Sequence, residues 1–295
     1  MLTIEPGKIA THLLHSHLLA SIAPRPIAFA STIDKDGQPN LSPFSFFNVF
    51  GVNPPIAIFS PARRVKNNSI KHTLENAAET GEVVINVVNY SMVQQMSLAS
   101  TEYAKGVNEF VKAGFTAEES VMVKPFRVKE SPVQLECKVK DIIYTGTEGG
   151  AGNLIVCEIL LVHIHENILD EQGKIDQHKI DLVGRLGADW YVRASGDALF
   201  EVAKPLTTMG IGVDSLPESI RLSSILTGND LGQLGNVERI PTQEEAQLYL
   251  DSSDWKSLAN EMGLNIHSNQ GNHEIAKSLL NRGLVSAAWN WLVAK

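Results

Sequence analysis

The stretch Asn40–Pro55 reads NLSPFSFFNVFGVNPP, and it decides how the rest of the chain is interpreted. It begins like a loop, holds a run of phenylalanines at its centre and ends in two consecutive prolines. Loops are usually polar, because a buried loop leaves backbone groups without hydrogen-bond partners. An aromatic loop therefore has two explanations: a corner packed into the core, or a backbone surface for a flat, planar ligand.

Apolar runs that are typical of strands lie on both sides of this stretch. Pro26–Thr32 is the first, and Asp34–Gly37 follows it as a strong turn signal, because glycine tolerates positive φ and aspartate caps the turn. Gln38–Leu41 begins the returning strand, and Ile56–Phe59 is a short strand after the prolines. The region is therefore predicted to be a hairpin that leads into an aromatic loop.

Short strands and turns dominate the chain up to about residue 213. Glu82–Val88 is predicted to be a buried strand, and Ser69–Ala78 has helical spacing of its apolar residues. Val133–Tyr144 and Leu154–Ile164 are long strand candidates, and the glycine-rich link Gly146–Gly152 predicts a hairpin between them. The fold class is therefore mainly β (α+β), and an antiparallel barrel or sandwich is favoured over a doubly wound sheet. Lys179–Val192 is expected to be irregular.

The pattern becomes helical after about Asp214. Thr242–Glu245 is a capping-box signature, with threonine at the cap and glutamate three residues later. Helices are expected over Ala246–Leu250, Trp255–Met262 and Glu274–Leu292. We therefore divide the chain into a domain at residues 1–213 and a helical extension at 214–295. We expect the extension to pack on the barrel or on a partner subunit.

Composition excludes several classes of partner and compartment. The net charge of −8 argues against a general affinity for nucleic acid or anionic membranes. No run approaches the roughly 18 apolar residues of a spanning helix, and the N-terminus does not resemble a signal peptide. Cys137 and Cys157 have no CxxC spacing and lie in apolar runs, so they are expected to be buried free thiols. A cytoplasmic location is predicted.

The clearest electrostatic feature is a basic segment directly after the aromatic stretch. Pro61–Leu74 holds no acidic residue, and its cationic residues are Arg63, Arg64, Lys66 and Lys71, with His72 beside them. At the start of a helix, backbone N–H groups and the helix dipole favour a phosphate, and Ser69 and Thr73 add hydroxyls. A solvated charged surface is the alternative. A planar-ligand loop beside a phosphate site is the combination that flavin mononucleotide (FMN) would need.

Other catalytic patterns are absent from the sequence. There is no GxSxG elbow, no GxGxxG after a strand and no Walker A motif. His163 and His165 share one face of a predicted strand, but no third ligand is near in sequence, so a structural or surface role is favoured over a metal site. Asp170–Gly173 lacks the ligands of a calcium loop. No metal site is predicted.

Taken together, the motifs resemble the flavin reductase-like family, which has the FMN-binding split-barrel fold and includes flavoredoxins. The resemblance covers roughly Ile22–Pro205, and the helical extension lies outside it. His72 departs from the family, which often has aspartate there. The matching segments are Ala23–Pro26, Ser31–Gly37, Asn40–Asn48, Asn53–Pro55, Lys71–Thr73, Thr80–Asn86, Glu109–Phe110, Gly114–Phe115, Ser131–Cys137 and Val183–Tyr191.

The resemblance implies a homodimer with FMN near the subunit interface. The residues expected to border the isoalloxazine, largely through backbone atoms, are Ser42, Phe44, Ser45 and Asn48. Thr32 is expected near the ring or the ribityl chain. The residues expected to hold the phosphate are Lys71 and Thr73, with Ser60, Arg64 and Lys66 as weaker candidates. Arg185 is expected to face the cofactor or to structure the end of the barrel.

The implied activity is hydride transfer from NADH or NADPH to FMN. Flavin carries this chemistry itself, so no catalytic acid or base is assigned. An oxygenase or a redox protein is the expected partner. Two alternatives stay open: an electron carrier of the flavoredoxin type with tightly bound FMN, and a flavin-binding module without turnover.

Overall fold

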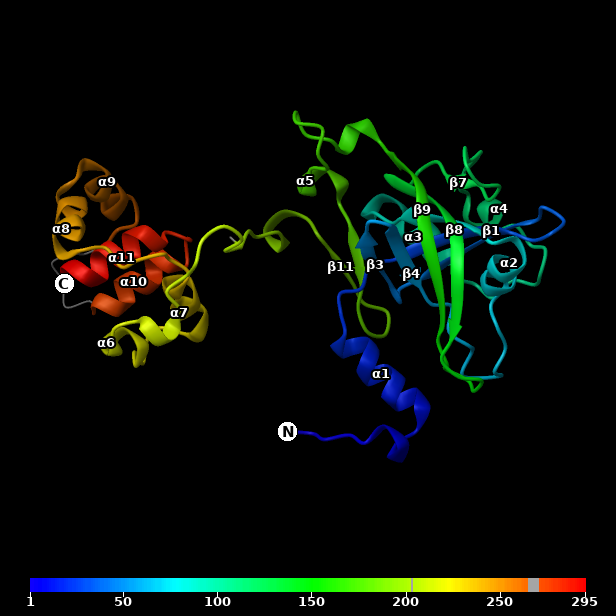
Figure 1. The fold of residues 1–295 in the computed structure, drawn as a ribbon, viewed down its shortest axis with the longest axis horizontal. Coiled ribbons are helices and arrows are strands. Elements are labelled where there is room, and N and C mark those ends of the chain that lie inside the picture. Colours follow the sequence, from blue (N-terminus) through cyan, green and yellow to red (C-terminus); the bar gives the residue numbers. More distant parts are fainter. Residues whose placement is uncertain (203, 265–270) are drawn as a thin grey trace. The chain divides into compact units, whose positions relative to one another are not determined.

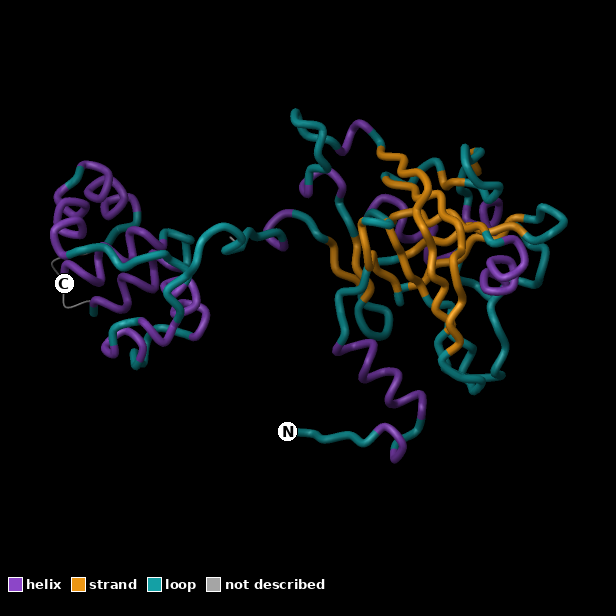
Figure 2. The backbone as a smooth tube through the Cα atoms, viewed as in Figure 1, coloured by secondary structure: helices purple, strands orange, loops and turns teal. Residues whose placement is uncertain are grey.

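The computed structural model describes residues 1–202, 204–264 and 271–295. The chain forms two compact units, Met1–Phe200 and Glu201–Lys295. The boundary predicted after residue 213 falls inside the second unit. Among the described residues, all strands belong to the first unit, and helices make up most of the regular structure of the second (Figure 2).

The first unit is built on a seven-stranded antiparallel sheet (Figure 1). The order across the sheet is β2-β1-β5-β8-β9-β4-β3. The strands of this sheet are β1 (Ala28–Ile33), β2 (Pro39–Phe44), β3 (Phe47–Val52), β4 (Pro55–Phe59), β5 (Glu82–Val87), β8 (Val133–Tyr144) and β9 (Asn153–Ile164). Two short hairpins complete the strands: β6 (Ala117–Glu118) with β7 (Arg127–Val128), and β10 (Val183–Arg185) with β11 (Tyr191–Arg193).

The sheet must curl because its two edge strands follow each other in the chain. Only Ser45 and Phe46 separate the end of β2 from the start of β3, yet these strands stand at opposite ends of the strand order. Three Cα steps span at most about 11 Å, so the two edges come close together. The sheet is therefore an antiparallel barrel that is open between β2 and β3, which is one of the two architectures, barrel or sandwich, that the strand pattern predicted.

The stretch Asn40–Pro55 is mostly strand, and its prediction as a loop was wrong. It contains the end of β2, the bend at Ser45–Phe46 and the whole of β3, and Asn53–Pro54 makes the turn into β4. Pro43 lies within β2, where proline is tolerated because an edge strand has one side without a ladder partner. Edge position explains why a sequence with loop-like residues forms strands here.

Two apolar clusters cover the two faces of β1. Ala28, Phe59 and Ile85 belong to the barrel interior, together with residues of α2 (His72–Thr80), which packs on β1 and β2. The second cluster lies under α3 (Val93–Leu98) and α4 (Glu109–Ala113). The first unit also contains α1 (Thr11–Ser21) and α5 (Gln177–Ile180).

The long hairpin predicted around the glycine-rich link is confirmed. β8 and β9 pair from Val133–Ile164 to Tyr144–Asn153, with two register shifts along the ladder. Cys137 and Cys157 lie on these strands, buried and not joined in a disulfide, as predicted. Burial raises the pKa of both thiols, that of Cys157 to about 12. The segment Lys179–Val192 was expected to be irregular, but it forms the β10–β11 hairpin, whose strands are too short to give a periodic pattern.

The second unit has its own apolar core, formed by residues between Leu216 and Val293. Trp255 stacks on Trp291 at 5.6 Å between ring centroids, and Trp289 is also buried. Its helices are α6 (Glu218–Arg221), α7 (Gly228–Gly235), α8 (Gln243–Asp251), α9 (Ser253–Glu261), α10 (Asn272–Leu280) and α11 (Val285–Ala294). None of the helices in the described ranges is both long and apolar enough to cross a membrane.

Two local signals in this unit had different outcomes. The capping box at Thr242 is confirmed, because its hydroxyl accepts from the Glu245 N–H and the Glu245 carboxylate accepts from the Thr242 N–H. The single helix predicted over Glu274–Leu292 is instead two helices, α10 and α11. Gly283 between them has a φ of 72°, a left-handed conformation that ends a helix.

Candidate functional site

The N-terminus of α2 points positive charge at a cleft in the first unit. Lys71 is the N-cap residue in extended conformation, and no side chain within the described residues caps this end of the helix. The first backbone N–H groups of a helix have no partner inside it, and the helix dipole adds partial positive charge there. The start of α2 therefore offers donors to an anion.

Arg64 and Lys71 bring two cations to the same cleft. The Arg64 guanidinium donates to the Ser69 hydroxyl at 2.9 Å and to the Ile70 carbonyl at 2.7 Å, which fixes it against the loop before α2. Burial and the nearby Arg64 charge lower the pKa of Lys71. Two like charges held side by side favour an anion between them.

Hydroxyl and amide groups line the cleft beside these cations. Ser42 on β2 and Thr73 in the first turn of α2 are both part of the lining. The Thr73 hydroxyl donates to Asn40 Oδ1 at 2.8 Å, and Asn40 Nδ2 donates to Glu109 at 3.1 Å. Glu109 also accepts from the Leu41 N–H at 3.0 Å, and burial raises its pKa. This buried chain of contacts ties β2, α2 and α4 together.

An acidic residue from a distant segment also enters the cleft. Glu102 lies in the loop after α3, and its carboxylate accepts from Arg64 Nε at 2.6 Å and lies 4.0 Å from Lys71 Nζ. Hydrogen bonding and charge from Arg64 lower the pKa of Glu102, and the charges of Lys71 and Lys66 add to this. The structure therefore brings two of the predicted cations, Arg64 and Lys71, close to one carboxylate, whereas Lys66 is exposed and acts on it only through its charge.

The residues predicted around the flavin ring lie on β1, on β2, at the bend and at the start of β3. Thr32 is buried, and its hydroxyl accepts from Asn76 of α2 at 3.1 Å. Phe44 packs in the core against Phe59, whereas Phe46 is 42% exposed. The amide of Asn48 is exposed and accepts from the next backbone N–H, that of Val49.

Ser45 is held by a buried arginine that the sequence interpretation missed. Arg25 donates to the Ser45 hydroxyl at 3.3 Å and to the carbonyls of Ile22 and Leu186 at 2.7 and 2.9 Å. Burial and the nearby Arg185 charge lower the pKa of Arg25. Arg25 therefore links the end of α1, the bend between β2 and β3, and the segment after β10.

Two predicted residues lie apart from the cleft at α2. The Ser60 hydroxyl accepts from the Asn153 N–H at 3.1 Å and so joins β4 to β9. Arg185 lines a different cleft, of about 400 Å³, between α3 and the β10–β11 hairpin. Its guanidinium lies 4.6 Å from the centroid of the Tyr191 ring.

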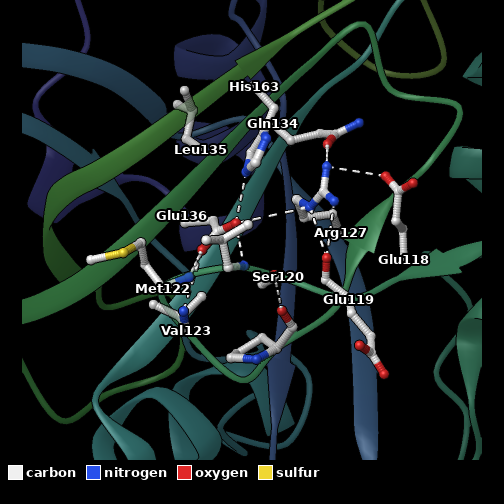
Figure 3. A network of polar contacts seen from close by, with 12 residues as sticks. Glu118, Glu119, Ser120, Met122, Val123, Arg127, Gln134, Leu135, Glu136 and His163 are labelled. Carbon is white, nitrogen blue, oxygen red and sulfur yellow. Dashed lines mark hydrogen bonds and ion pairs between the residues drawn. The ribbon is translucent and has the colours of Figure 1, made fainter.

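His163 at the end of β9 and His165 just after it make contacts within the fold. His163 Nε2 lies 2.7 Å from Glu136, a fully buried carboxylate on β8, and His165 Nε2 lies 3.1 Å from the Lys129 carbonyl. Figure 3 shows Glu136 facing the loop around Met122 and Val123, with Arg127 on its other side. Within residues 1–202, 204–264 and 271–295, no group of three potential ligands could hold a metal ion.

Sequence reasoning missed Arg25, Asn40, Glu102 and Glu109 as parts of this region. Asn40 and Arg25 lie in motifs that were singled out, so a search for side chains that fix those motifs could have found them. Glu102 stands in LASTEYAKG, which has no periodic pattern, and its partner Arg64 is 38 residues away. No local signal marks that pairing.

Comparison with known proteins places these features in a family. The family model described as "Flavin reductase like domain" matches residues 20–179, which lie wholly in the first unit. An uncharacterized protein of Aquifex aeolicus is 39% identical over 189 residues, which cover 64% of this chain and 94% of that protein.

Two solved structures extend the comparison to the fold. Nitrilotriacetate monooxygenase component B from Bacillus cereus has a TM-score of 0.64 and 28% identity, covering 68% of this chain and 98% of that chain. A candidate flavin reductase with a split barrel domain from Shewanella frigidimarina has a TM-score of 0.58 and 28% identity, covering 69% and 99%. The split-barrel fold expected from the sequence is thereby confirmed.

Proposed function

This chain belongs to the flavin reductase-like family, and on that premise we propose that it is an FMN-dependent oxidoreductase that accepts hydride from NADH or NADPH. The observation that carries the proposal is the convergence of Arg64, Lys71 and the uncapped start of α2 on one cleft. A phosphate monoester suits this donor set, because arginine, lysine and helix N-terminal N–H groups all bind phosphate.

The hydrogen bonds that the cleft residues make within the protein indicate which of their groups are available to a phosphate. Arg64 and Lys71 supply charge, and Ser42 supplies a hydroxyl at the same cleft. Because the Thr73 hydroxyl donates its proton to Asn40, Thr73 serves a phosphate through its backbone N–H instead. Lys66 is exposed and contributes only its longer-range charge.

The flavin ring is proposed to lie along the end of β2 and the bend that follows it. Arg25 holds Ser45, and the small residues Ala28 and Ala30 lie opposite Phe44 and Ser42 in the β1–β2 register. When bound, FMN supplies the hydride chemistry, so the residues of this chain bind and orient. Thr32, Phe44 and Asn48 remain candidates for the ring environment, and Ser60 and Arg185 are weaker ones.

A homodimer is part of the proposal. On edge strand β3, Phe50 is 66% exposed and Val52 is 87% exposed, and every described residue of α1 is at least partly exposed. Leu160, Val162 and Ile164 on β9 are exposed as well. Exposed apolar side chains on β3 and β9, which both pair with β4, favour burial against another subunit. Sedimentation velocity should give twice the chain mass of 32.2 kDa.

The similarity to a monooxygenase component supports an oxygenase as the recipient of reduced flavin. A redox protein is the other candidate partner. The second unit lies outside the family match, and we propose no enzymatic activity for it.

The test is flavin binding followed by anaerobic reduction. The protein should quench FMN fluorescence, and NADH or NADPH should bleach the flavin absorption band near 450 nm. Arg64→Ala with Lys71→Ala should weaken FMN binding, whereas Lys138→Ala, at an exposed position on β8, should leave it unchanged. Failure of the protein to bind added FMN would contradict the proposal. Reduction by reduced ferredoxin but by neither nucleotide would identify an electron carrier instead.

A further inference from the structure

Glu102 occupies the point where the cations of the proposed phosphate site meet. Its carboxylate accepts from Arg64 Nε at 2.6 Å and lies 4.0 Å from Lys71 Nζ. The Arg64 side chain is 18% exposed and the Lys71 side chain 29%, so both cations are largely shielded from water. A carboxylate and a phosphate are ligands of the same kind for these two side chains.

The carboxylate itself is free to leave. The Glu102 side chain is 63% exposed, and its described polar partners are the cations of this cleft. The segment that carries it, Ser100–Tyr103, is a turn after α3 held by backbone bonds such as Thr101 N–H to Leu98 O at 3.2 Å. Because water can solvate the Glu102 carboxylate well, this ion pair contributes little to stability.

Glu102 stays charged at neutral pH, since Arg64 lowers its pKa. A flavin phosphate that enters the cleft must therefore displace a negative charge from Arg64 or share the cations with it. Sharing places two anions close together, which costs free energy in a partly shielded site.

We propose that Glu102 is an internal competitor for the phosphate, which lowers affinity for FMN while leaving affinity for riboflavin unchanged. The inference rests on the proposed FMN function. Glu102 thereby acts as a specificity-determining residue that moderates the preference for phosphorylated flavins.

The experiment measures dissociation constants of FMN and riboflavin by fluorescence quenching for the full chain and its variants. Glu102→Gln removes the charge and keeps the shape, and it should bind FMN about three- to tenfold more tightly. Glu102→Lys should tighten FMN binding further. Glu79→Gln, at an exposed position at the far end of α2, is the matched control and should change neither constant.

Riboflavin lacks the phosphate, so comparing it with FMN distinguishes the competitor role of Glu102 from the proposed flavin function. Tighter FMN binding with unchanged riboflavin binding supports the competitor role. If FMN and riboflavin both bind but the Glu102 variants leave the FMN constant unchanged, the competitor role is wrong while the flavin function stands. If no variant binds either flavin, both the function and the inference fail. Inorganic phosphate should compete with FMN at lower concentrations in Glu102→Gln than in the unaltered protein.

Discussion

Glu102 and Glu136 are both carboxylates beside an arginine, but their surroundings are opposite. Glu136 is fully buried, and it accepts from the N–H groups of Val121 and Val123 at 2.8 and 3.3 Å and from His163 at 2.7 Å (Figure 3). Glu102 is 63% exposed, and its partners are side chains on one cleft.

The difference shows how burial assigns a role to an ion pair. Burial alone would raise the pKa of Glu136, but hydrogen bonds from the Val121 and Met122 N–H groups and from His163 outweigh it, and the pKa is lowered. Removing a carboxylate from such a place leaves several donors without a partner. If Glu102 is removed, water or another anion can take its place beside Arg64 and Lys71. The first carboxylate therefore holds structure, and the second can be exchanged for a ligand.

The largest expected effect is the loss of the buried carboxylate. Glu136→Ala should lower the free energy of unfolding by about 3 kcal/mol, because it leaves backbone N–H groups and His163 without an acceptor. Urea denaturation followed by tryptophan fluorescence and circular dichroism measures the change. Glu102→Ala is the control and should leave the midpoint in place. Equal destabilisation by the two substitutions would remove the distinction between them.

The second largest effect is expected on FMN binding at Arg64 and Lys71, the cations that lie beside Glu102. Lys71→Ala should weaken FMN binding by about 2 kcal/mol, or roughly thirtyfold, because a charge-assisted contact to the phosphate is lost. Lys66→Ala should have a smaller effect, since that side chain is exposed. Adding Thr73→Ala to Lys71→Ala should increase the loss only modestly, because the Thr73 hydroxyl is bonded to Asn40. Titration of flavin fluorescence decides this, and unchanged affinity in the double variant would show that the phosphate binds elsewhere.

The pH dependence of stability should also distinguish Glu136 from Glu102. The folded pKa of Glu136 lies below the unfolded value of about 4.3, so its stabilising effect is present above that pH and is lost as the pH falls toward the folded pKa. The gap in unfolding free energy between the unaltered protein and Glu136→Gln should therefore narrow below about pH 4.3. Denaturation curves at several pH values measure it. For Glu102→Gln we expect little difference at any pH, and a gap as large as that of Glu136 would contradict the comparison.

The smallest effect is expected at an exposed pair in the second unit. Arg239 makes two hydrogen bonds to Glu245, at 2.6 and 2.7 Å, and with the Thr242 N–H it holds the pKa of Glu245 at about 2. Because both side chains are exposed, Arg239→Ala should shift the thermal midpoint only slightly, despite the ideal geometry. Thr242→Ala, which removes the helix cap, should shift it more. Differential scanning calorimetry compares the thermal midpoints of the two variants. A larger shift for Arg239→Ala would show that the hydrogen-bond geometry of the ion pair matters more than its exposure to water.

Local patterns predicted much of the fold. The β8–β9 hairpin follows from two long apolar runs around a glycine-rich link, and the start of α8 follows from its capping box. Prediction failed where position in the sheet overrode residue type. The segment Asn40–Pro55 has the composition of a loop, but it lies on the two edge strands, where proline and polar residues cost little. The break at Gly283 was missed because the apolar spacing continues across it.

Part of the candidate site could be predicted because its residues lie close together in the chain. Arg64, Lys71 and Thr73 lie within ten residues of each other beside a helix start, so their clustering is visible in the chain. The phenylalanine run did not show which of its members would be buried: Phe44 packs in the core, whereas Phe46 is exposed at the bend. Which face a bend presents depends on the strands at both ends.

The sequence by itself determined the fold class, the β1–β2 and β8–β9 hairpins, the helical character of the C-terminal part and the basic segment beside α2, because each depends on residues close together in the chain. Tertiary structure alone decided that Glu102 meets Arg64 across 38 residues and that Glu136 meets His163 across 27. It also decided that one carboxylate is buried and the other exposed. Burial and long-range pairing arise only when the sheet curls and loops pack onto it, and these two properties decide whether an ion pair supports the fold or is available to a ligand.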